Sequence, residues 1–220
     1  MLALNLISYS IPPLTFNDSP EKAIQWMNDF HVRHLPVVKD GKFEGILTED
    51  EALNSIDPDE PISASNPVLI YKCVKSDQHL FDVMKFIVDT DLTIVPVVDS
   101  EAKYLGLITL ERLIKYFAET VSITQPGGII TLEMPPRDYS LAEIARIIES
   151  ENTKIISCFV SSQYGKEMLE LTIKLSKQDL KHVIATLQRF GYEVKSSFYE
   201  NDLHNDLQDR HNALMKYLNP

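Results

Sequence analysis

Two segments of the chain place a threonine hydroxyl three residues before a charged side chain. Thr48 precedes Glu51 in GILTEDE, and Thr109 precedes Arg112 in GLITLER. A hydroxyl donates and accepts hydrogen bonds, a carboxylate accepts only, and a guanidinium donates only. These residue types favour binding through hydrogen bonds and charge. The sequence contains no G-x-S-x-G, P-loop, H-E-x-x-H or C-x-x-C motif, so we expect no enzyme activity.

Each threonine also stands where a helix is expected to begin, so helix capping is a second explanation of these residues besides ligand binding. A threonine in that position accepts a hydrogen bond from a backbone N–H of the first turn. Thr48-Glu49-Asp50-Glu51 has the form of a capping box, in which the side chain of Glu51 reaches back to the N–H of Thr48. For Arg112 the alternative is a solvated charge on a helix.

Two further groups of side chains are of types that bind metals. His31 and His34 are three residues apart, a spacing that brings two ligands onto one face of a helix. The pair Arg33-His34 is better explained as a turn that leads into a strand. Oxygen ligands for a divalent cation could come from Asp50, Asp57, Asp59 and Glu60. These acids span a proline-containing linker, which favours a solvated acidic loop, so we expect no metal site.

The elements that must position these residues occur twice. The segment LPVV at 35–38 matches VPVV at 95–98, and GILT at 45–48 matches GLIT at 106–109. Each copy predicts a β-hairpin that runs into a helix, because short β-branched runs flank a polar turn such as Asp40-Gly41. Repetition at a long fixed period indicates a duplicated architecture.

A helix is expected before each hairpin. Ser19-Pro20-Glu21 has the cap, the proline and the acid that are typical of a helix start. In the second copy the pattern predicts a strand over 68–74, a helix over 77–88 and a last helix over 110–117. Trp26 lies on the first helix and is expected in the core or between the repeats.

This doubled β-α-β-β-α order, with its h-P-V-V and G-h-h-T segments, resembles the tandem cystathionine β-synthase (CBS) domain pair, or Bateman module. The resemblance covers residues 1–120, with repeats at about 5–56 and 62–118. It implies two clefts that take adenosine derivatives, with the ribose held by a G-h-h-[ST]-x-x-D motif. The implied ligands are AMP, ADP, ATP or S-adenosylmethionine.

Carried over to this sequence, the resemblance assigns the following cleft residues: Leu35, Pro36, Gly45, Ile46, Thr48, Glu51, Val95, Pro96, Gly106, Thr109 and Arg112. The carboxylate position of the motif is Glu51 in the first copy, which can accept from ribose hydroxyls with a longer reach. The same position is Arg112 in the second copy. A guanidinium cannot accept such bonds, and it would instead contact a phosphate.

The pattern changes in residues 127–200, where strands are expected at 129–134, 154–161, 168–175 and 193–199, and helices at 141–150 and 176–190. This βαββαβ order predicts an antiparallel ferredoxin-like sheet with both helices on one face. It resembles the ACT domain, and Leu141 and Ile144 match apolar positions of that family's first loop and helix. The glycine of that loop is replaced by Tyr139 or Ser140. An amino-acid site and pairing with a second copy are both open.

The last segment, 201–220, has leucines at near-helical spacing at Leu203, Leu207, Leu214 and Leu218. It predicts a terminal helix that docks either on its own chain or on a partner. The fold class as a whole is α+β. A CBS pair followed by an ACT-like domain resembles the acetoin-utilisation protein family of bacteria, which implies a regulatory protein and gives no evidence of action on acetoin.

Charge and composition narrow the classes of function. The chain carries a net charge of −11, and residues 1–120 have 10 Lys and Arg against 19 Asp and Glu. Nucleic-acid binding needs a basic footprint, so we expect none. The apolar start lacks the basic flank of a signal peptide, and no apolar run is long enough to span a membrane. Cys73 and Cys158 are expected as buried free thiols of a cytoplasmic protein.

Three functions compete on this evidence. The first is a regulatory module in which the CBS pair senses an adenine nucleotide or a related metabolite and the ACT-like domain couples it to dimerisation or to an unidentified protein target. The second is a structural or dimerisation protein with vestigial clefts. The third is an amino-acid sensor acting through the ACT-like domain. A homodimer is the default assembly for both modules.

Overall fold

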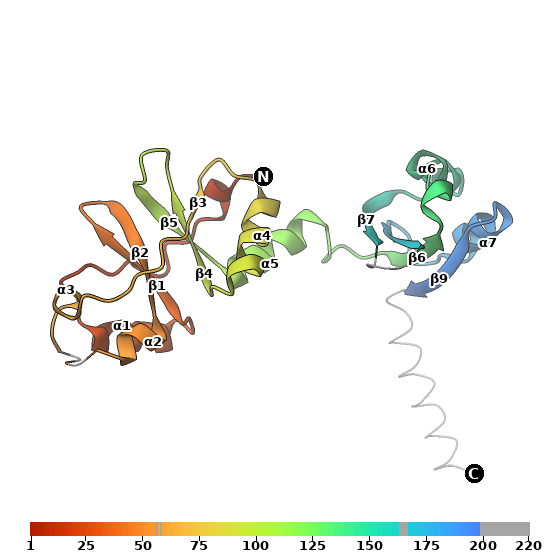
Figure 1. Ribbon diagram of the computed structural model, residues 1–220. Helices are drawn as coiled ribbons and strands as arrows, with labels where there is room; N and C mark the ends of the chain where they lie inside the picture. The colour runs from red at the N-terminus through yellow and green to blue at the C-terminus, as the bar shows by residue number, and fades with distance from the viewer. Residues whose placement is uncertain (56, 58, 163–166, 199–220) are drawn as a thin grey trace, which may run out of the picture. The chain divides into compact units, whose positions relative to one another are not determined.

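The computed structural model describes residues 1–55, 57, 59–162 and 167–198, and the chain divides into two units. The first unit is Met1–Phe117 and the second begins at Ala118 (Figure 1). The helix predicted at 201–220 lies outside the described residues.

The first unit contains two hairpins, each followed by a helix. Its elements in chain order are η1 (Ala3–Leu6), α1 (Pro20–Asp29), β1 (His34–Lys39), β2 (Lys42–Thr48), α2 (Glu49–Leu53), α3 (Ile62–Ser65), β3 (Val74–Lys75), α4 (Leu80–Thr90), β4 (Ile94–Val98), β5 (Tyr104–Thr109) and α5 (Leu110–Thr120). Strands β1 and β2 form one sheet, and β3-β4-β5 form another. The predicted duplication of hairpin and helix is confirmed.

The two hairpins share an irregularity at the same point of the repeat. The register between β1 and β2 shifts after Val37, which pairs with Gly45, and the register between β4 and β5 shifts after Val97, which pairs with Gly106. A β-bulge of this kind bends a strand and increases its twist. Gly45 has φ +152° and Gly106 has φ +146°, conformations that only glycine adopts readily.

Both glycines also lie under a segment from elsewhere in the chain. A Cβ on Gly45 would be 2.7 Å from Cβ of Leu69, and a Cβ on Gly106 would collide with Cγ2 of Ile7. The neighbouring backbones are hydrogen-bonded: Ile46 and Ile70 exchange two bonds of 3.0 Å, and the N–H of Ser8 donates to Leu107 at 2.8 Å. The first segment of each repeat therefore packs on the hairpin of the other repeat.

This exchange corrects the predicted strand over 68–74. The observed strand β3 has only two residues, Val74 and Lys75, and it pairs in parallel with β4. Ile70 is instead bridged to the first hairpin. The first repeat has no named strand before α1. In that segment Leu14 forms a parallel bridge to Val37, and Ser8 forms an antiparallel bridge to Leu107. The predicted helix over 77–88 begins later, at Leu80, because His79 is its cap.

Helix starts in the first unit follow the sequence more closely. The hydroxyl of Ser19 accepts from the N–H of Lys22 and caps α1, as expected. Trp26 is half-buried against the core of the first repeat, and the ammonium of Lys22 lies 4.5 Å from the centre of its ring. Cys73 and Cys158 are free thiols, as expected, but both are only half-buried. Burial raises the pKa of Cys73.

The second unit is a four-stranded antiparallel sheet in the order β7-β8-β6-β9. Its elements are β6 (Gly128–Met134), η2 (Pro136–Asp138), α6 (Leu141–Ser150), β7 (Ile155–Ser162), β8 (Leu169–Leu175), α7 (Lys181–Arg189) and β9 (Glu193–Phe198). Both helices pack on one face, since a single core joins Leu132 and Leu171 of the sheet to Ile148 of α6 and Leu187 of α7. The predicted order of elements is observed.

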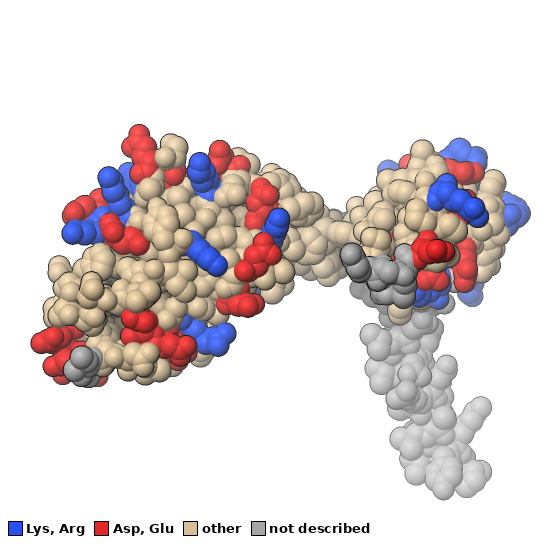
Figure 2. All heavy atoms as spheres, in the orientation of Figure 1, with Lys and Arg blue, Asp and Glu red and all other residues tan. Residues whose placement is uncertain are grey.

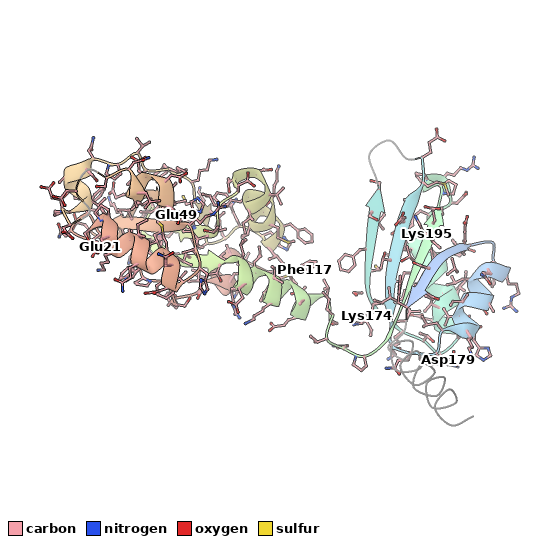
Figure 3. All side chains as sticks on the ribbon, turned by 90° about the horizontal axis from the view of Figure 1, so that it is seen from below. Glu21, Glu49, Phe117, Lys174, Asp179 and Lys195 are labelled. Carbon is pink, nitrogen blue, oxygen red and sulfur yellow. The ribbon has the colours of Figure 1, made fainter. Side chains whose placement is uncertain are left out.

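Two details of the second unit differ from the sequence prediction. The helix predicted from residue 176 begins at Lys181, because Ser176 to Leu180 form the turn between β8 and α7. The loop predicted after β6 contains the short helix η2. Lys195, labelled in Figure 3, donates to Glu133 at 2.8 Å and also to Glu170, and these two carboxylates raise its pKa.

Among the residues described in either unit, no helix has the length and apolar character needed to cross a membrane.

Candidate functional site

Thr48 and Glu51 lie where the first hairpin meets α2. Oγ1 of Thr48 accepts a hydrogen bond from the N–H of Glu51 at 3.1 Å, so Thr48 caps the helix as predicted. The second half of the predicted capping box is wrong. Oε1 of Glu51 accepts from the backbone N–H of Val68 at 2.9 Å. Glu51 thus ties α2 to the segment that follows α3.

A pocket of about 430 Å³ opens beside Glu51. Its lining residues come from α2, from the loop after it and from α3: Glu51, Asn54, Ser55, Asp57, Glu60, Ala64, Ser65 and Pro67. We call this cavity the Glu51 pocket. Its volume falls in the range of about 300–1,000 Å³ that is usual for small-molecule sites.

The wall formed by α3 is held by backbone bonds to the segment before α1. The N–H of Ile62 donates to the carbonyl of Asp18 at 2.8 Å, and the N–H of Ser63 donates to Phe16 at 3.0 Å. Burial raises the pKa of Asp18, but hydrogen bonds from Lys22 and Thr15 outweigh it and lower that pKa overall. This end of the unit, with α1, α2 and α3, is rich in acidic side chains in Figure 2.

The corresponding position of the second repeat is built differently. Oγ1 of Thr109 accepts from the N–H of Arg112 at 3.2 Å, which reproduces the cap seen at Thr48. The side chain of Arg112 is exposed on α5, and no carboxylate occupies its position. The neighbouring Glu111 pairs with Lys115 at 2.5 Å on the same helix, and this lysine lowers the pKa of Glu111.

Most of the other predicted cleft residues are buried in the structure. They are Leu35, Pro36, Gly45, Ile46, Val95, Pro96 and Gly106. Pro36 pairs with Ile46 across the first hairpin, and the same pairing in the second hairpin joins Pro96 to Leu107. Of the eleven predicted residues, Glu51 alone is among those that line the Glu51 pocket.

Sequence reasoning did not identify Asn54, Ser55, Ala64, Ser65 and Pro67 as lining residues. They belong to no motif, and they come together only because α3 folds back beside α2. Two of the acids considered for a cation, Asp57 and Glu60, do line the pocket.

The metal hypotheses gain no support. Asp50 is exposed on α2, and the N–H of Asp59 donates to Oδ1 of Asp57 at 3.0 Å. Within the described ranges, no three His, Cys, Asp or Glu side chains are placed to hold a metal ion.

His34 joins the two repeats. Its Nδ1 lies 2.9 Å from Oγ1 of Thr93 and accepts from the N–H of Thr93 at 3.2 Å. Burial lowers the pKa of His34, the charge of Arg33 lowers it further, and the carboxylates of Glu49 and Asp50 oppose the change. Burial and the charge of Arg33 thus favour the neutral form of this ring between the repeats. It begins β1, as the alternative to a metal ligand predicted.

The second unit has an open groove of about 610 Å³ between α6 and β7. Leu141, which matched the ACT pattern, lines it together with Ala145, Ile155 and Cys158. The hydroxyl of Ser140 accepts from the N–H of Glu143 and caps α6.

Comparison with solved structures finds chains of similar fold. A CBS domain pair/ACT domain protein from Thermotoga maritima is 17% identical with a TM-score of 0.48, over 54% of this chain and 98% of that chain. CBSX2 in complex with AMP is 16% identical with a TM-score of 0.46, over 54% and 96%. The CBS domain pair of protein MJ0100, in complex with 5′-methylthioadenosine and S-adenosyl-L-methionine, is 24% identical with a TM-score of 0.43, over 54% and 97%.

The family comparison covers both repeats. The model of the CBS domain matches residues 5–58 and again residues 61–119, which together make up just over half of the chain. These ranges contain both hairpins, both capping threonines and the lining residues of the Glu51 pocket except Glu60. The chain therefore belongs to the CBS domain family, as a tandem pair.

Proposed function

We propose that this chain is a regulatory protein that binds an adenosine derivative in the Glu51 pocket. Binding in the CBS pair is coupled, in this proposal, to the second unit, which acts as an ACT-like domain. The resemblance to the acetoin-utilisation proteins belongs to the same proposal and assigns no role in acetoin chemistry.

The observation that carries the proposal is the position of the pocket. In a chain that belongs to the CBS family, a cavity of about 430 Å³ lies beside Glu51, which occupies the carboxylate position of the ribose motif. Oε1 of Glu51 is engaged by the N–H of Val68, and a carboxylate has further lone pairs for ribose hydroxyls. The exposed side chains of Leu53 and Val68, next in sequence to lining residues, offer apolar surface for a base.

The second repeat supports a ligand less well. Its motif ends in Arg112, whose guanidinium cannot accept from a ribose hydroxyl, and the side chain is exposed on α5. We therefore assign ligand binding to the first repeat and give Thr109 the role of a helix cap.

The role of the second unit rests on its topology. A βαββαβ sheet with both helices on one face is the arrangement expected of an ACT-like domain. β7 lies at an edge of this sheet and exposes Phe159 and Val160, and edges of this kind commonly pair with a second copy. We propose pairing through this edge. Analytical ultracentrifugation of Val160→Lys beside the wild type checks it, with loss of a dimer expected.

The ligand proposal is tested by thermal shift with AMP, ADP, ATP, S-adenosylmethionine and adenosine. What the similar solved structures bind guides only this choice of probes. A ligand that binds the native state at about a hundred times its Kd adds about 2.7 kcal/mol of stability, which raises the melting temperature by several degrees. Glu51→Gln should reduce the shift, because its amide nitrogen cannot accept from a ribose hydroxyl.

Glu49→Gln is the matched control, since Glu49 lies on the same helix and is absent from the pocket lining (Figure 3). It removes the same charge and should leave the shift unchanged. No shift with any of the five compounds at millimolar concentration would retire the proposal and favour a structural protein with vestigial clefts.

A further inference from the structure

The Glu51 pocket combines a cavity with an unusual balance of charge. Among the described residues that line it, Glu51, Asp57 and Glu60 are carboxylic acids, and none is Lys, Arg or His. A phosphate placed in such a pocket would face like charges, and like charges in contact oppose binding. The lining therefore discriminates between ligands by their charge.

A phosphate could still bind if backbone N–H groups compensated, as they do in phosphate-binding loops. Three of the N–H groups near the described lining already have acceptors within the protein. The N–H of Val68 donates to Glu51, that of Asp59 donates to Asp57, and that of Ala64 donates to the carbonyl of Pro61 at 2.8 Å.

Lys22 of the neighbouring helix α1 is also engaged. Nζ of Lys22 lies 2.5 Å from Oδ1 of Asp18 and over the ring of Trp26. The described lining thus presents three carboxylates, and the hydroxyls of Ser55 and Ser65 already donate to the carbonyls of Asp57 and Ile62. This arrangement suits a ligand that brings positive charge or N–H and O–H donors.

We propose that the Glu51 pocket selects an adenosine derivative that carries no phosphate and has a cationic substituent, such as a sulfonium or an ammonium group. This inference rests on the proposed function, because it names the class of ligand for the same pocket. Glu51 receives the ribose hydroxyls, and Asp57 and Glu60 face the cationic substituent. Mono- and triphosphates of adenosine are excluded by charge.

The test is isothermal titration of the full chain with four probes: S-adenosylmethionine, adenosine, AMP and ATP. The expected order of affinity is S-adenosylmethionine above adenosine above AMP and ATP, with about tenfold or more between the cation and AMP. Raising the salt concentration from about 50 mM to about 500 mM should weaken the binding of S-adenosylmethionine, because salt screens the attraction.

The double variant Asp57→Asn/Glu60→Gln removes two of the three charges and leaves Glu51 in place. The variant should bind S-adenosylmethionine about tenfold more weakly than the wild type does, and its affinity for AMP should be close to its affinity for adenosine. The matched control is Asp89→Asn/Glu101→Gln, which removes two exposed charges of the second repeat that do not line the pocket. The control should bind all four probes as the wild type does.

The outcomes separate the inference from the proposed function. If AMP or ATP binds as tightly as adenosine or more tightly, the charge selection is wrong and the proposed function stands. If the control variant changes the affinities as much as the pocket variant does, the selection does not arise in the pocket and the inference is overturned. If none of the four probes binds, both fall.

Discussion

The two repeats of the CBS pair share the same backbone arrangement and differ at one position that matters for binding. Each has a bulged hairpin, a glycine under a crossing segment, and a threonine that caps the next helix. Three residues after the threonine, the first repeat has Glu51 beside a pocket and the second has an exposed Arg112. Packing accounts for the shared features, whereas the carboxylate position differs between the repeats: Glu51 is half-buried and accepts from Val68, and Arg112 is exposed.

The comparison also shows that the repeats depend on one another. The segment around Ile7 covers Gly106 of the second hairpin, and the segment around Leu69 covers Gly45 of the first. At their turns the hairpins are joined directly, since the N–H of Tyr104 donates to Gly41 at 2.9 Å. The pair is therefore one folding unit, and a substitution that destabilises one hairpin should lower the stability of both repeats.

The largest effect is expected at the two covered glycines. Gly45→Ala and Gly106→Ala each place a Cβ against Leu69 or Ile7 and force alanine into a conformation that only glycine favours. Each should lower the free energy of unfolding by about 3 kcal/mol or more, from backbone strain and overpacking together. Urea denaturation measures the loss.

Gly41→Ala is the control for this pair. Gly41 also has a positive φ, +78°, but a Cβ there would meet no atom within 4 Å. Its loss should be smaller, about 1 kcal/mol. Equal losses at the three glycines would show that the crossing segments do not press on the hairpins.

The capping threonines should give the next largest effect. Thr48→Val and Thr109→Val each remove the side-chain acceptor of a cap and should cost about 1 kcal/mol of stability. Thr48→Ser and Thr109→Ser keep the hydroxyl and should cost less, as urea denaturation would show. A loss at one threonine only would break the equivalence of the repeats.

Substitution of Tyr104 by phenylalanine should increase the stability of the chain. It occupies the position of Phe43 in the other hairpin, and the two rings stack at 6.4 Å. The hydroxyl of Tyr104 is buried and, among the described residues, finds no hydrogen-bond partner, and burial raises its pKa. Tyr104→Phe should therefore raise stability, by less than about 1 kcal/mol.

Phe43→Tyr tests the reverse change at the equivalent position and should destabilise the chain. If Tyr104→Phe instead lowered the unfolding free energy by more than about 1 kcal/mol, the hydroxyl would have a hydrogen bond that this account lacks.

The smallest effect on stability is expected from the protonation of His34, whose counterpart in the second repeat is Ile94. The pKa of His34 in the folded chain lies below the usual 6.5, so the unfolded chain binds its proton first. Its contribution to stability is complete above about pH 6.5 and is lost as the pH falls through the lower, folded pKa. Protonation would also remove the bond that Nδ1 accepts from Thr93.

The check is urea denaturation at pH values near 7.5 and 5.5 for the wild type and for His34→Asn. The variant should lose less stability on acidification than the wild type does. His182→Gln, which replaces an exposed histidine of α7, should behave as the wild type. A steeper loss in His34→Asn would contradict the assignment.

Sequence reasoning found the features that depend on neighbours in the chain. The hairpins followed from short β-branched runs around turns such as Asp40-Gly41, and the start of α1 followed from the capping residue Ser19. The strand predicted over 68–74 failed because Ile70 pairs with Ile46 across the repeats, a contact that local propensity does not encode.

The candidate site divides in the same way. Thr48 and Glu51 stood out because they belong to a motif, and the cap at Thr48 followed from helix chemistry. The hydrogen-bond partner of Glu51 could not be predicted, because Val68 is distant in sequence and supplies only its backbone N–H. Residues such as Ser65 and Pro67 line the pocket only through the position of α3, whose four residues gave no periodic signal.

The central claim is that the first repeat binds the ligand and the second does not. Calorimetric stoichiometry with S-adenosylmethionine tests it most directly, on the wild type, Glu51→Gln and Arg112→Ala. We predict about one ligand per chain, with binding weakened by about tenfold or more in Glu51→Gln and unchanged in Arg112→Ala. Two equivalent ligands per chain, or binding that Arg112→Ala abolishes and Glu51→Gln leaves intact, would contradict the account.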